Sequence, residues 1–367
     1  MTKTRTQTQP SRPRPDSRRQ AVLVTIINEY LLSGEPVGSH VISAKFSCAP
    51  GWSSATIRNV MSELEELGFL EQPHTSAGRI PTDRGYRHYV DNMIDSTKLS
   101  KEDVAAIETI EVGDEVRVRP DRLMERASHV LSQLSDNVGI VVWPSLADNR
   151  LKHIRFVKLP DYRILVVLVS TSNIIQDKVI TLDEEFNQEE LNRTARFLNT
   201  EFAGKSLAAI RAEIIALMKK ERALYDSVVR NAILLCERSL QAEDSAVAAV
   251  FLDGASNIFG KPEFSSTERI RELLQTFEEK SRLIKILNEC VAGEASGNVQ
   301  VVIGTENPVS SMQHCSVITT SYRVGTDVCG TLGVVGPTRI AYGRMMAVVN
   351  YLGRFMERAF SSEVSLQ

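Results

Sequence analysis

The feature that most constrains the fold is the run from Ser53 to Gly68, in which apolar residues recur at spacings of three and four. This spacing predicts a helix with one buried stripe. The hydroxyl of Ser53 can accept hydrogen bonds from the free N–H groups of the first turn, and Gly68 is a typical helix stop. The buried stripe would consist of Ile57, Val60, Met61, Leu64 and Leu67.

Two shorter helical patterns precede this run. Between residues 18 and 32 the apolar side chains keep helical spacing, and a Ser-Gly pair then ends the helix. A second helix would start after Pro36 with Ser39 as its N-cap, and residues 48–52 supply a break. Three short helices with a tight break before the third are the outline of a helix-turn-helix.

The outward side of the third helix carries short polar or guanidinium side chains near its N-terminal end, namely Ser54, Thr56, Arg58, Asn59 and Ser62. Arginine can bind guanine, and asparagine adenine, through two parallel hydrogen bonds. The N-terminal half of a recognition helix is the part that enters the major groove. Acidic residues begin only at Glu63, whereas a merely solvated face would more often carry Glu–Lys pairs. DNA contact is therefore predicted for these five residues, with a solvated face as the alternative.

A β-hairpin is predicted after the third helix, over residues 69–80, because a turn near Gly78 separates two short strand-like runs. Such a wing can lay polar side chains along the DNA backbone and insert an arginine into a minor groove. A surface hairpin without a ligand is the alternative. A further helix from Thr82 is expected to pack back on the first three. The predicted wing contacts are His74, Thr75, Ser76 and Arg79.

Two stretches of this region resemble the HrcA family of bacterial heat-inducible transcription repressors: PVGSHVIS at 36–43 and SSATIRNVMSELEELGFLEQPHTSAGRIPTDRGYRHYVD at 53–91. The resemblance implies a winged-helix repressor that binds an inverted-repeat operator, called CIRCE, upstream of chaperone operons. It also implies that the chaperonin GroEL maintains the protein in its active form. It places residues 74–79 in the wing, whereas the basic, proline-rich arm before residue 18 departs from the family pattern. In the recognition helix it places Ser54, Thr56, Arg58 and Asn59.

Strand-like and helical patterns fill the rest of the chain. Residues 189–241 are helical, and their apolar seam needs a partner, either within the chain or in a second subunit. Strands return near the C-terminal end, before a last helix that starts at Pro337. This order predicts an α+β domain interrupted by a mostly helical insert. The runs expected to form one half of a sheet are 138–143, 153–158, 164–170 and 174–182, and the later strands are 299–303, 315–322 and 331–335.

The resemblance to HrcA returns in VVIGTENP at 301–308 and in GTLGVVGPTRIAYGRMMAVVNYL at 330–352. It implies a GAF-like domain carrying an inserted dimerisation domain, and therefore a homodimer that matches the two-fold symmetry of an inverted repeat. The expected fold class is α+β, with an N-terminal winged helix-turn-helix followed by a GAF-like domain with a mostly helical insert. The expected divisions are a flexible basic arm (1–17), the winged-helix domain (18–97), a linker (98–119), the first GAF-like part (120–184), the inserted dimerisation domain (185–264), the second GAF-like part (265–361) and a tail (362–367).

Composition and motifs argue against other classes of protein. No apolar run among the 367 residues approaches the ~18–20 residues of a membrane span, so the cytoplasm is the expected location. Five cysteines without a C-x-x-C pair are expected to be buried free thiols. The six histidines show no metal-ligand spacing, and no nucleophile elbow, P-loop or dinucleotide fingerprint occurs, so no enzyme, metal or cofactor is expected. A small-molecule-responsive regulator remains the alternative, because GAF-type folds often hold ligands.

Overall fold

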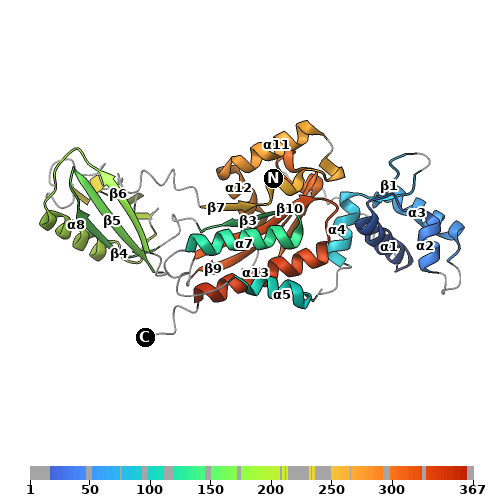
Figure 1. The fold of residues 1–367 in the computed structure, drawn as a ribbon, viewed down its shortest axis with the longest axis horizontal. Helices are drawn as coiled ribbons and strands as arrows, with labels where there is room; N and C mark the ends of the chain where they lie inside the picture. The colour runs from blue at the N-terminus through green and yellow to red at the C-terminus, as the bar shows by residue number, and fades with distance from the viewer. Residues whose placement is uncertain are drawn as a thin grey trace, which may run out of the picture. The chain divides into compact units, whose positions relative to one another are not determined.

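A computed structural model describes residues 17–46, 52–74, 77–92, 98–110, 120–144, 150–171, 175–206, 209–210, 212–213, 231–232, 234–235, 249–264, 266–291, 298–324 and 328–361. They fall into two compact units. The first combines the residues up to 98 with segments 303–316 and 336–345, and the second contains the remainder. Helices and strands both contribute (Figure 1), which confirms the expected mixed α+β class.

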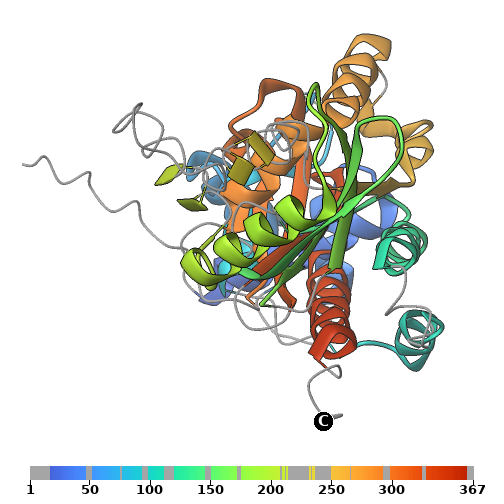
Figure 2. The ribbon, with the colours of Figure 1, turned by 90° about the vertical axis from the view of Figure 1, so that its left-hand side faces the viewer.

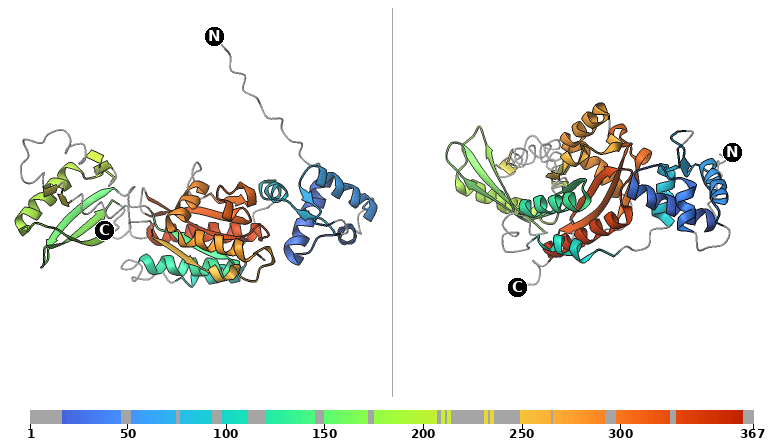
Figure 3. Two further views of the ribbon diagram at one scale, coloured as in Figure 1. Left: turned by 90° about the horizontal axis from the view of Figure 1, so that it is seen from above. Right: turned by 45° about the vertical axis from the view of Figure 1, so that its right-hand side comes forward.

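The N-terminal part of the first unit, residues 17–92, is called the head. It consists of three helices, a two-stranded antiparallel sheet and a fourth helix (Figure 3). The helix predicted after Ser53 is confirmed, and so is the hairpin, although each of its strands has only two residues. The elements are α1 (Ser17–Ser33), α2 (Ser39–Lys45), α3 (Ser54–Glu66), β1 (Leu70–Glu71), β2 (Ile80–Pro81) and α4 (Asp83–Asn92).

The head has its own apolar core, because α1 and α3 each turn one stripe inward. Ile26 and Ile27 of α1 and Ile57 and Leu64 of α3 are completely buried. Helix α4 approaches β1 so closely that a Cβ atom on Gly85 would lie 2.2 Å from the carbonyl oxygen of Phe69. Only glycine fits there, so the return of α4 onto the hairpin is a fixed feature of the head.

A five-stranded sheet has the strand order β7-β3-β10-β9-β8. All five residues of β3, which lies between β7 and β10, are buried. It pairs antiparallel with β10 through Val141 and Leu332, and with β7 through Val141 and Phe251. Strands that are distant in sequence therefore meet at β3. The strands are β3 (Val138–Val142), β7 (Val250–Asp253), β8 (Gln300–Ile303), β9 (Cys315–Val324) and β10 (Val328–Pro337).

Two helices cover one face of this sheet, and Tyr322 of β9 contacts both. Its hydroxyl donates a 2.9 Å hydrogen bond to the carbonyl of Val142 and lies 3.4 Å from the sulfur of Met124 in α7. Its ring stacks on Phe360 of α13 with centroids 6.3 Å apart. Burial raises the pKa of this phenol far above its ordinary value, so it stays a neutral donor. The second unit includes the helices α5 (Lys101–Glu108), α7 (Pro120–Ser135), α11 (Thr267–Glu278), α12 (Lys280–Val291) and α13 (Tyr342–Ser361), the last of which begins in the first unit.

Gly139→Ala should destabilise the protein, because helix α7 lies directly on strand β3. A Cβ at this position would lie 2.3 Å from the carbonyl oxygen of Ser128 and 2.7 Å from Cβ of Leu131. Overpacking of this kind costs about 1–3 kcal/mol of unfolding free energy. Urea unfolding followed by circular dichroism measures the loss, with Gln133→Ala on the exposed side of α7 as control. Equal midpoints for both variants would contradict the close packing.

The expectation that residues 138–143, 153–158, 164–170 and 174–182 form one half of a sheet is wrong. Only β3 belongs to the five-stranded sheet, and the three runs after it form a separate antiparallel sheet in the order β4-β5-β6. The reason is burial: β3 is buried on both faces, whereas β4 alternates between buried and exposed residues and needs cover on one face only. The elements of the second sheet are β4 (Leu151–Lys158), β5 (Arg163–Ser170), β6 (Ile175–Thr181) and helix α8 (Gln188–Glu201).

Helix α8 lies across one face of the three-stranded sheet (Figure 2) and also caps its β4 edge. The side-chain amide of Asn199 accepts from the N–H of Ile154 at 2.7 Å and donates to its carbonyl at 3.0 Å. Gln188 accepts from the N–H of Lys158 at 2.9 Å and donates to the carbonyl of Phe156 at 3.0 Å. The outward polar groups of β4 are thus satisfied by side chains instead of by another strand.

This sheet and α8 share a core with described parts of the segment predicted to carry a helical seam. Ile210, Ala232 and Leu235 are buried there together with Phe156 and Leu198. These three seam positions therefore pack within the chain. The other seam positions, Leu207, Ile214, Leu217, Leu224 and Val228, lie outside the described residues.

The expectation of buried thiols holds for Cys315 and fails for Cys329, which is exposed; Cys290 is half-buried. All three are free. Burial raises the pKa of the Cys315 thiol to about 12, so this thiol stays protonated at neutral pH. Cys48 and Cys236 lie outside the described residues. Among the helices that the structure describes, none is long and apolar enough to cross a membrane.

Candidate nucleic-acid interface

Helix α3 presents the candidate contact face because its N-terminus is fixed and its other side is buried. The hydroxyl of Ser53 accepts a 3.1 Å hydrogen bond from the backbone N–H of Thr56, as predicted for the N-cap. With the apolar stripe turned into the core, the helical period leaves Arg58 and Asn59 exposed. Neither side chain has a hydrogen bond or ion pair with another described residue. Both are therefore available for an external ligand.

The serine and threonine residues predicted beside them have different surroundings. The hydroxyl of Ser54 lies 3.1 Å from the hydroxyl of Ser39, which links the starts of α2 and α3. The hydroxyl of Thr56 lies 2.9 Å from that of Ser53. Ser62 is half-buried one turn further along. The five predicted residues therefore lie on one helix, but only the arginine and the asparagine extend fully into solvent.

The predicted wing residues are divided in the same way. His74 is exposed, while Thr75 and Ser76 lie outside the described residues. Arg79 pairs with Glu65 of α3, with Nε and Nη2 at 2.9 and 2.8 Å from one carboxylate oxygen, and its side chain is only 16% exposed. The backbone of Arg79 also exchanges two 2.9 Å hydrogen bonds with Val37. Arg79 therefore anchors the base of the hairpin to α3, and its guanidinium can reach a ligand only by leaving Glu65.

Arg18 also lies beside this face, although the sequence alone did not predict a role for it. The guanidinium carbon of Arg18 lies 4.8 Å from the ring centroid of Trp52, and Trp52 stacks on Phe46 at 4.4 Å. Trp52 immediately precedes the N-cap of α3, so Arg18 adds positive charge next to the start of that helix. Helix α1 begins at Ser17, so Arg18 lies in its first turn, as the predicted helix over residues 18–32 implies. Sequence spacing gives no signal for such a contact, because it depends on tertiary packing.

The described residues offer no competing metal centre: no group of three or more His, Cys, Asp or Glu side chains in them could hold a metal ion. The residues singled out in α3 and the hairpin contain hydrogen-bonding and cationic groups, and the carboxylates lie further along the helix. Glu63 pairs with Arg19 at 2.7 Å, and Glu65 pairs with Arg79. The N-terminal part of α3 therefore suits an anionic ligand that presents hydrogen-bonding edges.

Ser53→Ala should loosen α3, because the N–H of Thr56 would lose its acceptor. Loss of an N-cap costs about 1 kcal/mol, which corresponds to roughly five-fold faster amide exchange in the helix. Hydrogen exchange of the α3 amides measures this effect. Ser33→Ala is a suitable control, since that hydroxyl is exposed and donates to the carbonyl of Glu29 at the end of α1. Unchanged exchange in α3 would show that Ser53 does not cap it.

Comparison with known proteins agrees with these features. Residues 121–346 match the family model described as HrcA protein C terminal domain. The chain is 37% identical over 348 residues to the heat-inducible transcription repressor HrcA of Geobacter sulfurreducens, covering 94% of this chain and 98% of that one. It is 36% identical over 334 residues to that of Syntrophobacter fumaroxidans, covering 91% and 94%.

A solved structure described as a hypothetical protein shares the fold, with a TM-score of 0.61 at 24% sequence identity over 95% of this chain and 99% of that one. The sequence matches extend over nearly the full length of both curated relatives. They include the head as well as the segments that follow it. The chain therefore belongs to the HrcA family of heat-inducible transcription repressors.

Proposed function

We propose that this repressor binds an inverted-repeat, CIRCE-type operator upstream of chaperone genes as a homodimer, through a winged-helix head. The observation that carries the proposal is the pair Arg58 and Asn59, which are exposed on the outer face of α3 and have no polar partner among the residues that the structure describes. Arginine reads guanine and asparagine reads adenine with two hydrogen bonds each in a major groove. We propose a cytoplasmic location, because the targets of a transcription repressor lie on the chromosome.

The other predicted contacts have supporting roles in this proposal. Ser54, Thr56 and Ser62 would contact the walls of the groove, and the predicted contacts of His74, Thr75 and Ser76 would be to the phosphates. Arg79 holds the wing against α3. It can contact a phosphate only after its ion pair with Glu65 has broken. Because Glu65 satisfies Arg79 in the free protein, we assign most of the sequence preference to α3 and little to the wing.

The proposed dimer forms through the three-stranded sheet. Helix α8 covers one of its faces, and the other presents a row of apolar residues paired across the strands, Val157 with Leu165 and Leu165 with Val179. Val179 is 49% exposed. Arg155 and Asp177 lie on the same face, and a two-fold axis can pair such opposite charges. We propose that the dimerisation insert begins with β4, near residue 150, instead of at residue 185.

The five-stranded sheet with α7 and α13 on one face supports a GAF-like description of the domain into which this insert is placed. We propose that the chaperonin GroEL acts on the folding of this part of the chain. Operator binding by purified protein, measured with added chaperonin or with a metabolite extract, separates the two modes of control. A response to the extract alone would favour a regulator that senses a small molecule.

A footprint on the chaperone promoter of the source organism tests the proposed operator. The expected result is protection of two inverted half-sites whose centres lie a whole number of helical turns apart, so that both recognition helices approach one side of the duplex. A scrambled half-site provides the control. Protection of a single asymmetric site, or none, would overturn the proposal.

A further inference from the structure

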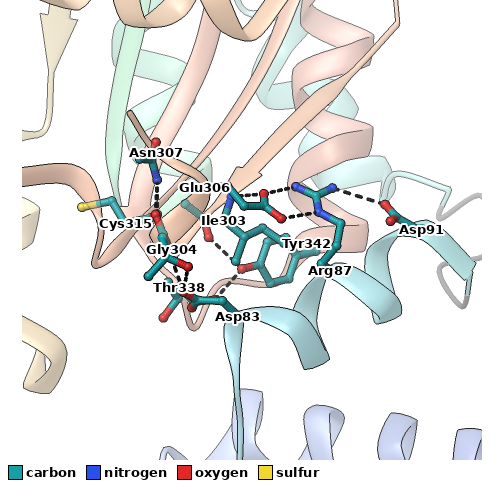
Figure 4. A network of polar contacts seen from close by, with 12 residues as sticks. Asp83, Arg87, Asp91, Ile303, Gly304, Glu306, Asn307, Cys315, Thr338 and Tyr342 are labelled. Atoms are coloured by element: carbon teal, nitrogen blue, oxygen red, sulfur yellow. Dashed lines mark hydrogen bonds and ion pairs between the residues drawn. The ribbon is translucent and has the colours of Figure 1, made fainter. Parts of the chain in front are cut away.

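Two polar contacts join helix α4 to the loop after strand β8 (Figure 4). The carboxylate of Asp83 accepts hydrogen bonds from the backbone N–H of Thr305 at 2.9 Å and from its hydroxyl at 3.0 Å. The guanidinium of Arg87 donates to both carboxylate oxygens of Glu306, through Nε at 2.8 Å and also through Nη2. Bidentate pairs of this kind fix geometry as well as distance. Asp83 and Arg87 are four residues apart and therefore lie on the same face of α4, one turn from each other. The loop thus contacts two successive turns of the helix.

The loop that receives α4 is itself braced. Glu306 also accepts a 2.8 Å hydrogen bond from the backbone N–H of Ile303. The side-chain amide of Asn307, which is 2% exposed, donates to the carbonyls of Gly304 and Cys315 at 2.9 Å each. The loop therefore presents Thr305 and Glu306 in a fixed arrangement instead of adapting to the helix.

A second segment contacts the same side of the head. The rings of Tyr86 and Tyr342 lie 5.5 Å apart, and the two residues are 2% and 0% exposed. The hydroxyl of Tyr342 donates to the carbonyl of Thr338 at 2.7 Å, and this hydrogen bond fixes the turn between the two residues. Arg339 donates to the carbonyl of Leu31 at 3.3 Å, near the end of α1. The head is thus held through α4 and the end of α1, in the same compact unit as both segments.

None of these contacts involves α3. Arg58 and Asn59 of α3 stay exposed. The contacts are made by α4 and by the end of α1 instead. The two receiving segments continue along the chain into β8, β9, β10 and α13. The contact set therefore joins α4 and the end of α1 to segments 303–316 and 336–345 within the first unit, without covering the residues proposed to read DNA.

We propose that Asp83, Arg87 and Glu306, with Gly304 beneath them, form an α4 lock whose residues position each head so that a dimer meets both half-sites at once. This inference rests on the proposed function, because it needs two heads on one inverted repeat. Heads held at a fixed spacing meet the second half-site at a high effective concentration, whereas released heads must first be ordered. A single half-site needs one head only and does not depend on the lock.

Gly304→Ala opens the lock without removing a charge. Gly304 has φ +51°, and a Cβ there would lie 2.2 Å from a carboxylate oxygen of Asp83. Gly204→Ala is the matched control, because it has φ +80° and a Cβ there would meet nothing within 4 Å. Affinity of the full-length protein for the inverted repeat should fall about ten-fold in Gly304→Ala, a typical coupling between two sites. Affinity for a single half-site should be unchanged, and the control variant should behave like the wild type on both DNAs.

A charge exchange provides a second test, which does not depend on the backbone at Gly304. Arg87→Glu should produce the same selective loss on the inverted repeat, and so should Glu306→Arg. The double variant Arg87→Glu with Glu306→Arg restores opposite charges and should recover most of the lost affinity. Arg193→Gln removes a comparable exposed Arg–Glu pair on α8 and serves as control.

The outcomes separate this inference from the proposed function. A wild-type protein without preference for the inverted repeat over a half-site would overturn the proposed function itself. If the wild type shows that preference and the lock variants keep it, the lock has no positioning role. Equal losses on both DNAs with a lowered melting temperature, and no recovery in the charge exchange, would assign these residues to stability alone and overturn the inference.

Discussion

Arg58→Ala is expected to abolish the preference of the protein for its operator over scrambled DNA while leaving the fold intact. The side chain is exposed on α3 and contacts no other described residue, so its removal costs little folding free energy. A bidentate arginine–guanine contact contributes about 1–3 kcal/mol of discrimination, and a dimer would lose it in both heads. The ratio of the two dissociation constants, measured by fluorescence anisotropy, reports the effect.

Two further variants separate base recognition from charge. Arg58→Lys keeps the positive charge but lacks the rigid fork of the guanidinium, so binding to scrambled DNA should persist while the preference is lost. Arg126→Ala removes an equally exposed arginine from α7 and should change neither quantity. An unchanged operator preference in Arg58→Ala would remove this residue from the recognition surface.

The second large effect is the dependence of operator binding on salt. A protein that neutralises about 6–10 phosphates loses about 10³–10⁵-fold in affinity between 50 and 200 mM salt. The first 100 residues carry 12 Lys and Arg against 10 Asp and Glu. The proposed dimer would bring two such regions to one site. We therefore expect a steep, linear fall of log affinity with log salt.

A titration series by anisotropy gives the slope, and sedimentation of the complex gives its stoichiometry. Two chains per inverted repeat and a steep slope are expected together, because the phosphate contacts of both heads contribute. The same titration on a half-site should give a smaller slope. A complex of one chain that is indifferent to salt would contradict both the dimer and the phosphate contacts.

Local spacing was sufficient to predict the head. The helix after Ser53, its serine N-cap and the short hairpin follow from residue patterns within fewer than twenty positions, where helix period and capping chemistry act directly. The exposure of Arg58 and Asn59 follows from the same period. Short-range physical chemistry therefore accounts for the fold of the head and for the central part of its candidate site.

Long-range pairing accounts for what the sequence could not show. That β3 pairs with β7 and β10, and not with the strands that follow it, depends on strands and helices distant in sequence that together enclose it. Arg79 was predicted to contact DNA from the wing, but in the structure it pairs with Glu65 and anchors the hairpin to α3. Glu306 lies in a stretch that stood out by resemblance, yet its pairing with Arg87, 219 residues away, has no local signature.

The covering of β4 by Asn199 and Gln188 affects how copies of the chain can associate. A rim whose amides and carbonyls are already occupied cannot recruit an extended segment from a neighbour, and so it does not seed an open-ended ribbon. In the dimer proposed above, two copies would instead associate through the uncovered face of the same sheet, and that face would be buried once the two copies have met. Growth would then stop at a closed pair, which is the stoichiometry that a palindrome requires.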